Sequence, residues 1–193
     1  LEGPMTAEPV PAGWEQNLLS FRADKDRDYA TAPDTPLHPD DRAGFTGLAY
    51  FPPDPGYRFV GPVHLHASPE SFTILSTTGK SRPAERYGEM RFSLNGQDLV
   101  LQVYRLLDSE APTPVQALFV PFTDKTSGVE SYPAGRYVDL RETGDGDYIL
   151  DFNRAFNPLC AYGMPERYAC PVTPSENRLK IRIEAGEKGY RKG

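Results

Sequence analysis

A chain of 193 residues is long enough for one ordinary domain, or for one domain with an extended arm. Its 21 Lys and Arg residues against 27 Asp and Glu residues give a net charge of −6, which disfavours the basic stripe that binds nucleic acid. The 20 Pro and 17 Gly residues disfavour a helix-rich fold, and the apolar runs are too short for a transmembrane helix. We therefore expect an acidic, globular, mainly β protein that binds neither nucleic acid nor membrane.

The first 13 residues are expected to lie outside the folded domain. Residues 1–5 look like an expression-tag remnant, and residues 7–13 contain prolines typical of a flexible lead-in. Neither part has the basic and apolar regions of a secretion signal, which favours a cytoplasmic location. The prediction is a tag remnant and lead-in over residues 1–13 and a single β-rich domain over residues 14–193.

One helix is predicted near the N-terminus, at residues 14–29. Trp14, Leu18 and Phe21 share one face of this helix, and charged residues fill the remaining positions. Three prolines between residues 31 and 41 then predict an extended strap across the surface.

From Gly47 onward the apolar residues alternate with a period of two, which indicates β-strands. A two-residue type I′ turn at Asn95-Gly96 would place the apolar residues on both sides of it on one face of a hairpin. Further strands are predicted at residues 57–66, 71–77, 116–122, 136–140, 147–153 and 178–184. About nine short strands predict a single antiparallel β-barrel or curved β-sandwich with one N-terminal helix.

The two cysteines, Cys160 and Cys170, leave three alternatives open. A disulfide would close a loop of about 11 residues but needs an oxidising compartment. A zinc site needs closer spacing and further Cys or His ligands. We favour free buried thiols or a pair of thiols in contact.

His64 and His66 project from one face of a predicted strand, opposite Phe59 and Leu65. Cupin barrels bind a metal with this spacing, but they also need a third histidine and a carboxylate. The remaining histidine, His38, lies in the strap. We therefore expect solvent-facing histidines and predict no metal site.

Polar residues suited to ligand recognition recur at predicted strand ends within residues 122–188. If the strand at 147–153 lines a barrel cavity, Asp151 and Asn153 point into it, whereas Asp151 is exposed if Phe152 belongs to the core. In the first case Arg136 would bind an anionic group, and Asp151 or Asp124 would act as base or acceptor. The candidate ligand-binding residues are Arg136, Asp151, Asn153, Asp124, Asp139 and Asn157.

The same residues also have a structural explanation, because Asp124 can close an Asx turn and Asn157 precedes a proline. Three functions follow. We favour binding of a small ligand, anionic if Arg136 contacts it, in a polar pocket at the mouth of a barrel. The alternatives are a hydrolase that uses a carboxylate as acid or base in the same pocket, and a structural or partner-binding domain. The residues specify neither a cofactor nor an oligomeric state.

Many of these positions also belong to a known pattern. The matching residues are 119–124 with Thr126 and Gly128, Tyr132, 135–137, 151–153, Ala155, 157–158, Cys160, 170–171, 176–177 and 185–188, and in the first half 40–42, Phe45 and 47–48. In these residues the chain resembles the domain of unknown function family numbered 1684, mostly bacterial and archaeal proteins of about this length. The resemblance spans residues 14–188. It implies that both cysteines belong to the family pattern and that His64 and His66 do not, and it implies no reaction or cofactor.

Overall fold

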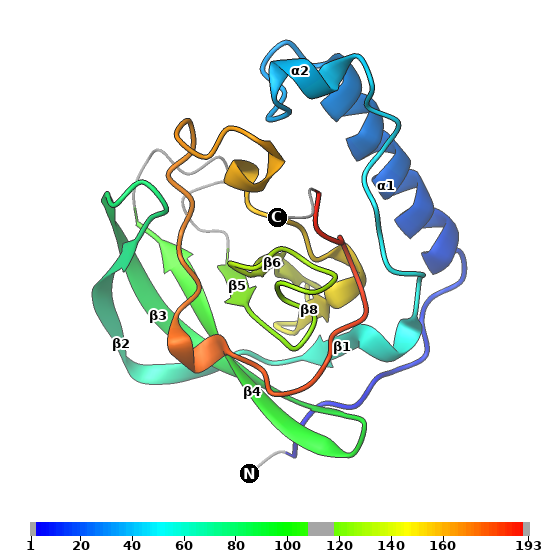
Figure 1. Cartoon of the computed structure of the whole chain (residues 1–193). Coiled ribbons are helices and arrows are strands. Elements are labelled where there is room, and N and C mark those ends of the chain that lie inside the picture. Colours follow the sequence, from blue (N-terminus) through cyan, green and yellow to red (C-terminus); the bar gives the residue numbers. More distant parts are fainter. Residues whose placement is uncertain (1–2, 108–117, 191–193) are drawn as a thin grey trace.

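The structure is a computed structural model that describes residues 3–107 and 118–190. Among these residues the chain forms eight β-strands, two α-helices and four short 3-10 helices (Figure 1). The mainly β, antiparallel class with an N-terminal helix is confirmed. The first two residues of the strand predicted at 116–122, like residues 1 and 2 of the expected tag remnant, lie outside the described residues. In chain order the elements are α1 (Trp14–Thr31), α2 (Pro39–Arg42), η1 (Pro55–Tyr57), β1 (Arg58–Gly61), β2 (His64–Leu75), β3 (Ser81–Leu94), β4 (Gln97–Leu106), β5 (Leu118–Phe122), β6 (Arg136–Asp139), β7 (Arg141–Glu142), β8 (Tyr148–Asp151), η2 (Phe152–Arg154), η3 (Leu159–Tyr162) and η4 (Ser175–Asn177).

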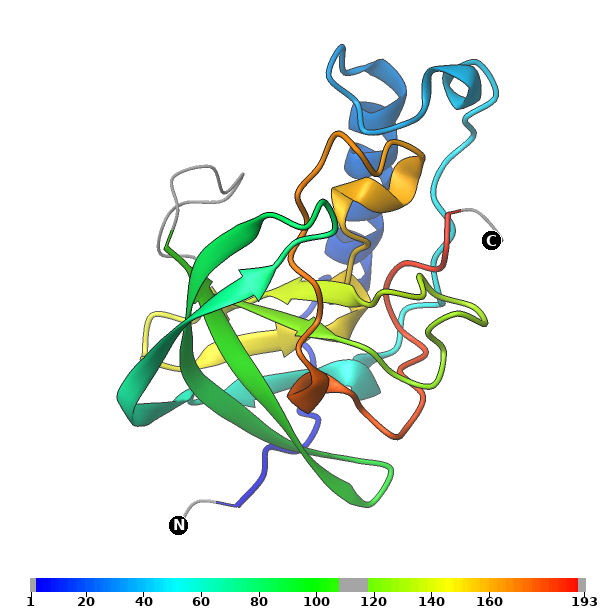
Figure 2. The same ribbon diagram turned by 60° about the vertical axis from the view of Figure 1, so that its left-hand side comes forward.

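The strands form two antiparallel sheets. The larger sheet has the order β2-β3-β4-β5-β6 and the smaller one the order β1-β8-β7. The chain passes between the sheets at two places, because β1 runs almost directly into β2 and β6 into β7. The result is a curved, barrel-like sandwich whose sheets do not close (Figure 2).

The hairpin of β3 and β4 has the predicted register. Met90 lies opposite Leu101, and both are buried together with Phe92. Asn95 and Gly96 have φ angles of 53° and 72°, as both central positions of a type I′ turn require. The prediction is confirmed because the turn residues and the apolar alternation select the same register.

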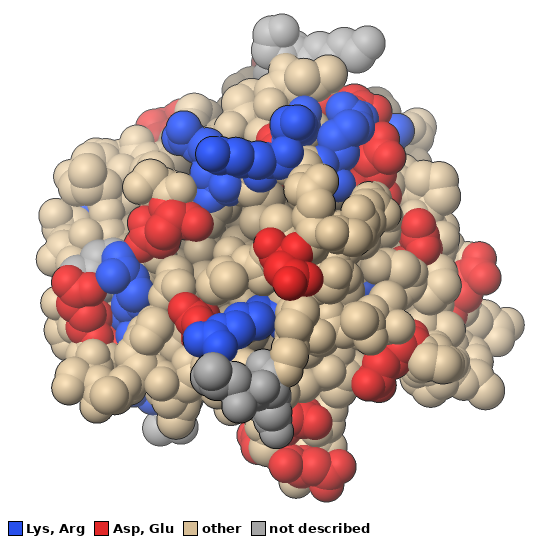
Figure 3. All heavy atoms as spheres, turned by 90° about the horizontal axis from the view of Figure 1, so that it is seen from below, with Lys and Arg blue, Asp and Glu red and all other residues tan. Residues whose placement is uncertain are grey.

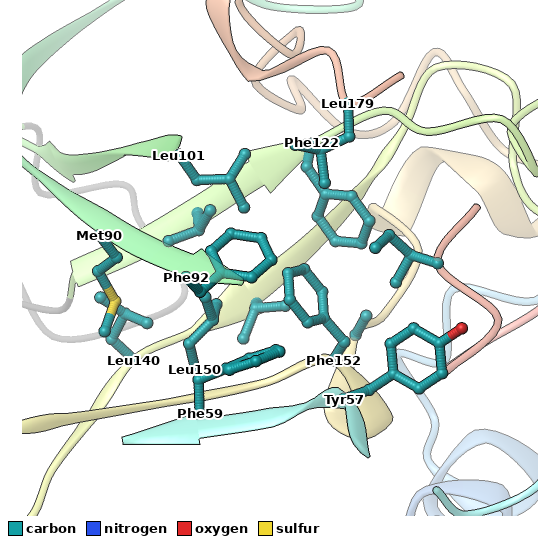
Figure 4. Packing of buried hydrophobic residues seen from close by; sticks show 14 of the residues in the cluster. Tyr57, Phe59, Met90, Phe92, Leu101, Phe122, Leu140, Leu150, Phe152 and Leu179 are labelled. Atoms are coloured by element: carbon teal, nitrogen blue, oxygen red, sulfur yellow. The ribbon is translucent and has the colours of Figure 1, made fainter. Parts of the chain in front are cut away.

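Four phenylalanines from both sheets form the centre of the core (Figure 4). Phe59 lies on β1, Phe92 on β3, Phe122 on β5 and Phe152 directly after β8, and all four are fully buried. The ring centroid of Phe152 is 5.5 Å from that of Phe92 and 5.2 Å from that of Phe122. One aromatic core therefore joins the two sheets.

The strand predicted at residues 178–184 is not formed. Leu179 and Ile183 are buried, as their alternation predicts, but their backbone pairs with a loop. The Leu179 N–H donates to the Thr123 carbonyl at 2.8 Å, and the Ile183 N–H donates to the Asp124 carboxylate at 2.8 Å. The alternation of apolar residues thus predicted the burial of these side chains correctly. The backbone of the segment, however, makes its hydrogen bonds to the loop after β5 and to the Asp124 side chain rather than to a neighbouring strand.

The strand predicted at 57–66 is split between the two sheets. Phe59 is buried on β1, as predicted, but Leu65 on β2 is 63% exposed, so its predicted inward orientation was wrong. The alternation continues through the buried Val63 and ends at Leu65, where the register between β2 and β3 shifts.

The segments on either side of α1 are also packed against the domain. The Met5 N–H donates to the Arg91 carbonyl at 2.8 Å, and the Met5 carbonyl accepts the Ser93 N–H at 2.7 Å, so the last residue of the expected tag remnant pairs with β3. Ala7, in the expected lead-in, forms an isolated bridge with Phe59 of β1. The strap after α1 contains α2 and buries Leu37 completely.

Helix α1 lies along one side of the curved sheets, next to the segment that leads to β1 (Figure 1). Its buried residues are Leu18 and Arg22, whereas Phe21, predicted on the packing face, is 37% exposed. Arg22 donates to the carbonyls of Phe51 at 2.9 Å and Asn153 at 3.1 Å. The face of α1 that packs against the sheets is therefore rotated from the predicted one, so that it includes the charged residue Arg22 in place of Phe21. Within the described part of the chain, no helix combines the length and apolar character needed to cross a bilayer.

Acidic and basic side chains are interspersed on the face of the molecule shown in Figure 3. Surface ion pairs such as Arg86 with Glu70 at 2.7 Å and Arg182 with Glu184 at 2.9 Å balance charge locally. Such exposed pairs contribute little to stability.

Candidate functional site

Arg136, the residue expected to bind an anion, is completely buried at the start of β6. Its guanidinium donates to the carbonyls of Ile183 at 2.9 Å, Glu187 at 3.1 Å and Ala185, and it forms an ion pair with Asp124 at 3.2 Å. Burial lowers the pKa of Arg136, and the Asp124 charge opposes this effect. Both terminal nitrogens of the guanidinium are thus engaged by groups of the protein itself.

Asp124 lies in the loop after β5 and forms the other half of this network. Its carboxylate accepts the backbone N–H of Thr126 at 3.0 Å and that of Ile183 at 2.8 Å. The first of these bonds is the Asx turn that the sequence predicts. The structure therefore brings Asp124 and Arg136 together as a link between this loop and the C-terminal segment, and a ligand-binding role for them stays a prediction.

Neither predicted orientation of the strand at 147–153 is observed, because Asp151 and Phe152 are both buried. The chain turns into η2 after Asp151, which ends the alternation. One carboxylate oxygen of Asp151 accepts the backbone N–H of Asn153 at 3.0 Å, and the other accepts the indole N–H of Trp14 at 3.3 Å. Asp151 thus caps η2 and fixes the first residue of α1.

The Asn153 side chain holds the loop that precedes β1. Its carbonyl oxygen accepts the Asp54 N–H at 2.9 Å, and its amide group donates to the Asp54 carbonyl at 2.8 Å. Asp54 stands between Pro53 and Pro55 in the sequence, so this double contact fixes both prolines.

A shallow depression of about 480 Å³ lies beside these two anchored segments. Its lining residues are Val10, Pro11, Gly13, Trp14, Glu15, Gln16, Leu19, Pro53 and Pro55. Trp14 and the prolines form an apolar wall, while Gly13 starts α1 with a φ of 75° and has no side chain to cap the first turn. The Trp14 N–H donates to the Pro11 carbonyl at 3.1 Å, whereas the N–H groups of Glu15 and Gln16 have no acceptor within the helix. In the sequence, the single tryptophan close to Pro11 and Gly13 was the signal that could have indicated this depression. The sequence did not indicate which loop this tryptophan faces.

The hydrogen bonds of the six candidate ligand-binding residues place them in separate groups rather than in one pocket. Asp139 is exposed at the end of β6. The Asn157 N–H donates to the Glu187 carboxylate at 3.0 Å, and its side chain donates to the Lys188 carbonyl at 2.9 Å. The groups are Arg136 with Asp124, Asp151 with Asn153, and Asn157 with Glu187. Asp139 shares no hydrogen bond with these groups and interacts electrostatically with Lys25. The hydrolase hypothesis placed Asp151 and Arg136 in one pocket, and the hydrogen bonds of these two residues have no partner in common.

Glu187 is a buried charged residue outside the predicted set. Its carboxylate forms an ion pair with Lys25 of α1 and accepts the Tyr162 hydroxyl. Burial, together with the Glu187 charge, raises the pKa of Tyr29, Tyr50 and Tyr162. Clusters of perturbed ionisable groups are candidates for functional sites.

Cys160 and Cys170 lie in contact as free, buried thiols. The Cys160 N–H donates to the Cys170 sulfur at 3.4 Å. A hydrogen bond from the Cys170 thiol lowers the pKa of Cys160 to about 7, while burial opposes the shift. Over the described residues, no group of three or more His, Cys, Asp or Glu side chains is arranged to hold a metal.

His64 and His66 are half-buried on β2 rather than fully solvent-facing. A ring nitrogen of His66 lies 2.8 Å from the carbonyl oxygen of the Gln102 side chain, whose amide donates to Glu89 at 3.1 Å. His66 is thereby tied into a polar network on the outer side of the larger sheet.

The family model described as "Protein of unknown function (DUF1684)" matches residues 43–188. The chain belongs to the DUF1684 family. Its structure is similar to the solution NMR structure of the uncharacterized protein from gene locus rrnAC0354 of Haloarcula marismortui, with 37% identity and a TM-score of 0.66. The similarity covers 91% of this chain and 94% of that chain. No match is found among curated proteins.

The matched DUF1684 residues contain all the buried polar groups of the sheets and loops described above. The matched region, residues 43–188, includes Arg136, Asp124, Asp151 and Glu187, whereas Trp14 and the rest of α1 precede this region. Both candidate regions, the depression beside Trp14 and the Glu187 cluster, therefore combine DUF1684 residues with side chains of α1.

Proposed function

We propose that this DUF1684 domain binds a small ligand in the depression beside Trp14. The observation that carries the proposal is a depression of about 480 Å³, within the size range of small-molecule sites, whose aromatic wall is anchored by Asp151. The ring of Trp14 is held by a hydrogen bond rather than free to rotate, and the facing prolines are held by Asn153. A wall fixed in this way is favourable for binding, because little side-chain entropy remains to be lost.

The lining favours a ligand with an apolar, preferably planar body and one acceptor group. Trp14, Leu19 and the prolines would contact the body, and the N–H groups of Glu15 and Gln16 in the first turn of α1 would meet the acceptor. Glu15 lies at the same rim, so a singly charged carboxylate suits the site better than a doubly charged phosphate.

Trp14 is the only tryptophan of the chain, so its fluorescence reports directly on this site. Titration with aromatic and aliphatic carboxylates should give a saturable change in intensity or emission maximum for at least one compound. Leu19→Asp adds a charge to the depression at a half-exposed position, and we expect its dissociation constant for that compound to rise about tenfold or more. Leu65→Asp is the matched control on β2 and should bind as the wild type does.

Two outcomes would contradict the proposal: the absence of any saturable response across such a series, or equal affinity of the Leu19 variant and the control. In either case the apolar wall beside Trp14 would be only a packing surface between α1 and the loop before β1.

We further propose that the protein works in a reducing compartment such as the cytoplasm. The contact between Cys160 and Cys170 as free thiols supports this proposal. Thiol titration of denatured protein, purified without reductant from its native cells, should find two thiols per chain, whereas none would place it in an oxidising compartment.

A further inference from the structure

The ammonium group of Lys25 lies in an enclosed aromatic and acidic site beneath α1. It forms an ion pair with Glu187 and lies 5.2 Å from the ring centroid of Tyr29, 5.3 Å from that of Phe156 and 5.8 Å from that of Tyr162. All three distances are within the range of cation–π attraction. The Lys25 side chain is 16% exposed and that of Glu187 only 1%.

The position of Glu187 is fixed by groups other than Lys25. Its backbone N–H donates to the Ala155 carbonyl at 2.9 Å, and its carboxylate accepts the Asn157 N–H at 3.0 Å and the Tyr162 hydroxyl. One carboxylate oxygen is thus held by the DUF1684 residues, and the other is directed at the lysine. The acidic part of the site would keep its orientation if Lys25 were absent.

Asn157, whose backbone N–H binds this carboxylate, has a side-chain acceptor without a donor in the described part of the chain. The side-chain oxygen of Asn157 has no hydrogen-bond partner among the described residues, although Asn157 is 1% exposed. The amide nitrogen of the same side chain is fixed on the Lys188 carbonyl. A buried acceptor without a donor is unfavourable, and Lys25 in its observed position donates to the carboxylate and not to this oxygen.

Helix α1 is attached to the rest of the chain mainly through charged and polar groups. Leu18 is its one fully buried apolar residue, while Arg22 binds backbone carbonyls and Asp26 accepts the Leu48 N–H at 2.9 Å. In this setting Lys25 enters its site much as a separate cationic ligand would.

We infer that Glu187, Phe156 and Tyr162 form a binding site for a primary alkylammonium group, and that α1 occupies it with its own Lys25. The three residues lie within the region matched to DUF1684, and the lysine precedes that region. The ligand class follows from the chemistry: one carboxylate for the charge and aromatic rings around the ammonium. An amine-bearing ligand that enters this site must displace Lys25. The inference does not depend on ligand binding beside Trp14.

The test is chemical rescue of a cavity of defined shape. Lys25→Ala removes three methylene groups and the ammonium, which together correspond to n-propylammonium. At about ten times its dissociation constant, n-propylammonium chloride should raise the midpoint of thermal unfolding of this variant by roughly 3 to 6 °C relative to sodium chloride of equal ionic strength. The wild type and Lys25→Met, whose side chains fill the site, should show no such rise.

Two further variants define the site. Adding Glu187→Gln to Lys25→Ala should abolish the rescue, whereas Lys180→Ala, at an exposed lysine, should not respond to propylammonium at all. If Lys25→Ala is unfolded at room temperature, propylammonium must restore the near-ultraviolet circular dichroism of the wild type where sodium chloride does not. The inference is overturned if propylammonium acts equally on Lys25→Ala and Lys25→Met, or acts no better than sodium chloride.

Discussion

Replacement of Arg136 by methionine tests whether the buried network of β6 is structural. Methionine keeps an unbranched side chain in the space but removes the charge and every N–H donor. The Asp124 carboxylate and the carbonyls of Ile183 and Ala185 are then left buried with fewer donors. Loss of one partner of a buried ion pair costs about 3 to 5 kcal/mol.

Unfolding followed by far-ultraviolet circular dichroism measures this loss. In a chain of this size 1 kcal/mol corresponds to about 2 to 4 °C in the unfolding midpoint, so the midpoint of Arg136→Met should fall by roughly 6 to 20 °C. Arg141→Met on β7 removes an exposed arginine and should change the free energy of unfolding by no more than about 0.5 kcal/mol.

A loss below about 1 kcal/mol for Arg136→Met would refute this reasoning. The double variant with Asp124→Asn separates the ion pair from packing, because the amide leaves no buried negative charge behind. We expect Asp124→Asn to be less destabilising in the Arg136→Met background than in the wild type. Strictly additive losses would show that the two side chains do not interact.

Two further outcomes concern backbone space and thiol ionisation. Gly186 has a φ of 78°, and a Cβ there would lie 2.6 Å from the Phe152 carbonyl oxygen, whereas Gly144 has a φ of 99° and open space around it. Gly186→Ala should therefore lower the free energy of unfolding by about 1 to 3 kcal/mol more than Gly144→Ala does. Equal losses for the two variants in urea unfolding would contradict this expectation. The pKa of Cys160 is lowered to about 7, below that of an unfolded thiol, so the free energy of unfolding should rise from about pH 7 to pH 8.5 and lose this contribution as the pH falls through 7. Under reducing conditions Cys160→Ser should lack this rise, and a pH profile identical to that of the wild type would exclude the lowered pKa.

The predictions that held were those encoded by neighbouring residues. The β3–β4 hairpin follows from Asn95-Gly96 and from the alternation on both sides of it, and both signals lie within about a dozen residues. The Asx turn of Asp124 is likewise complete within two residues. Such features need no knowledge of what packs against them.

The features that the sequence did not reveal depend on partners far along the chain. Arg136 receives its three carbonyl acceptors from residues 47 to 51 positions later, and Glu187 pairs with a lysine 162 positions earlier. A charged residue among other charged residues, such as Arg22 within α1, is typical of a solvent-exposed helix face, because buried charge is rare unless it is paired. The sequence does not contain the pairing, so it placed Phe21 rather than Arg22 beside Leu18 on the packing face.

Asp151 and Asn153 make hydrogen bonds within the protein, and a ligand-binding role for them stays a prediction. Their recognition chemistry is genuine, but it is directed at Trp14 and at the backbone of Asp54. Substituting them would move the wall of the depression and change folding and binding together, so such a variant could not distinguish a ligand-binding residue from a strut. Leu19, half-exposed and lining the depression, separates the two effects, and a ligand-binding function for this DUF1684 domain is therefore best tested at the surface that these polar residues position.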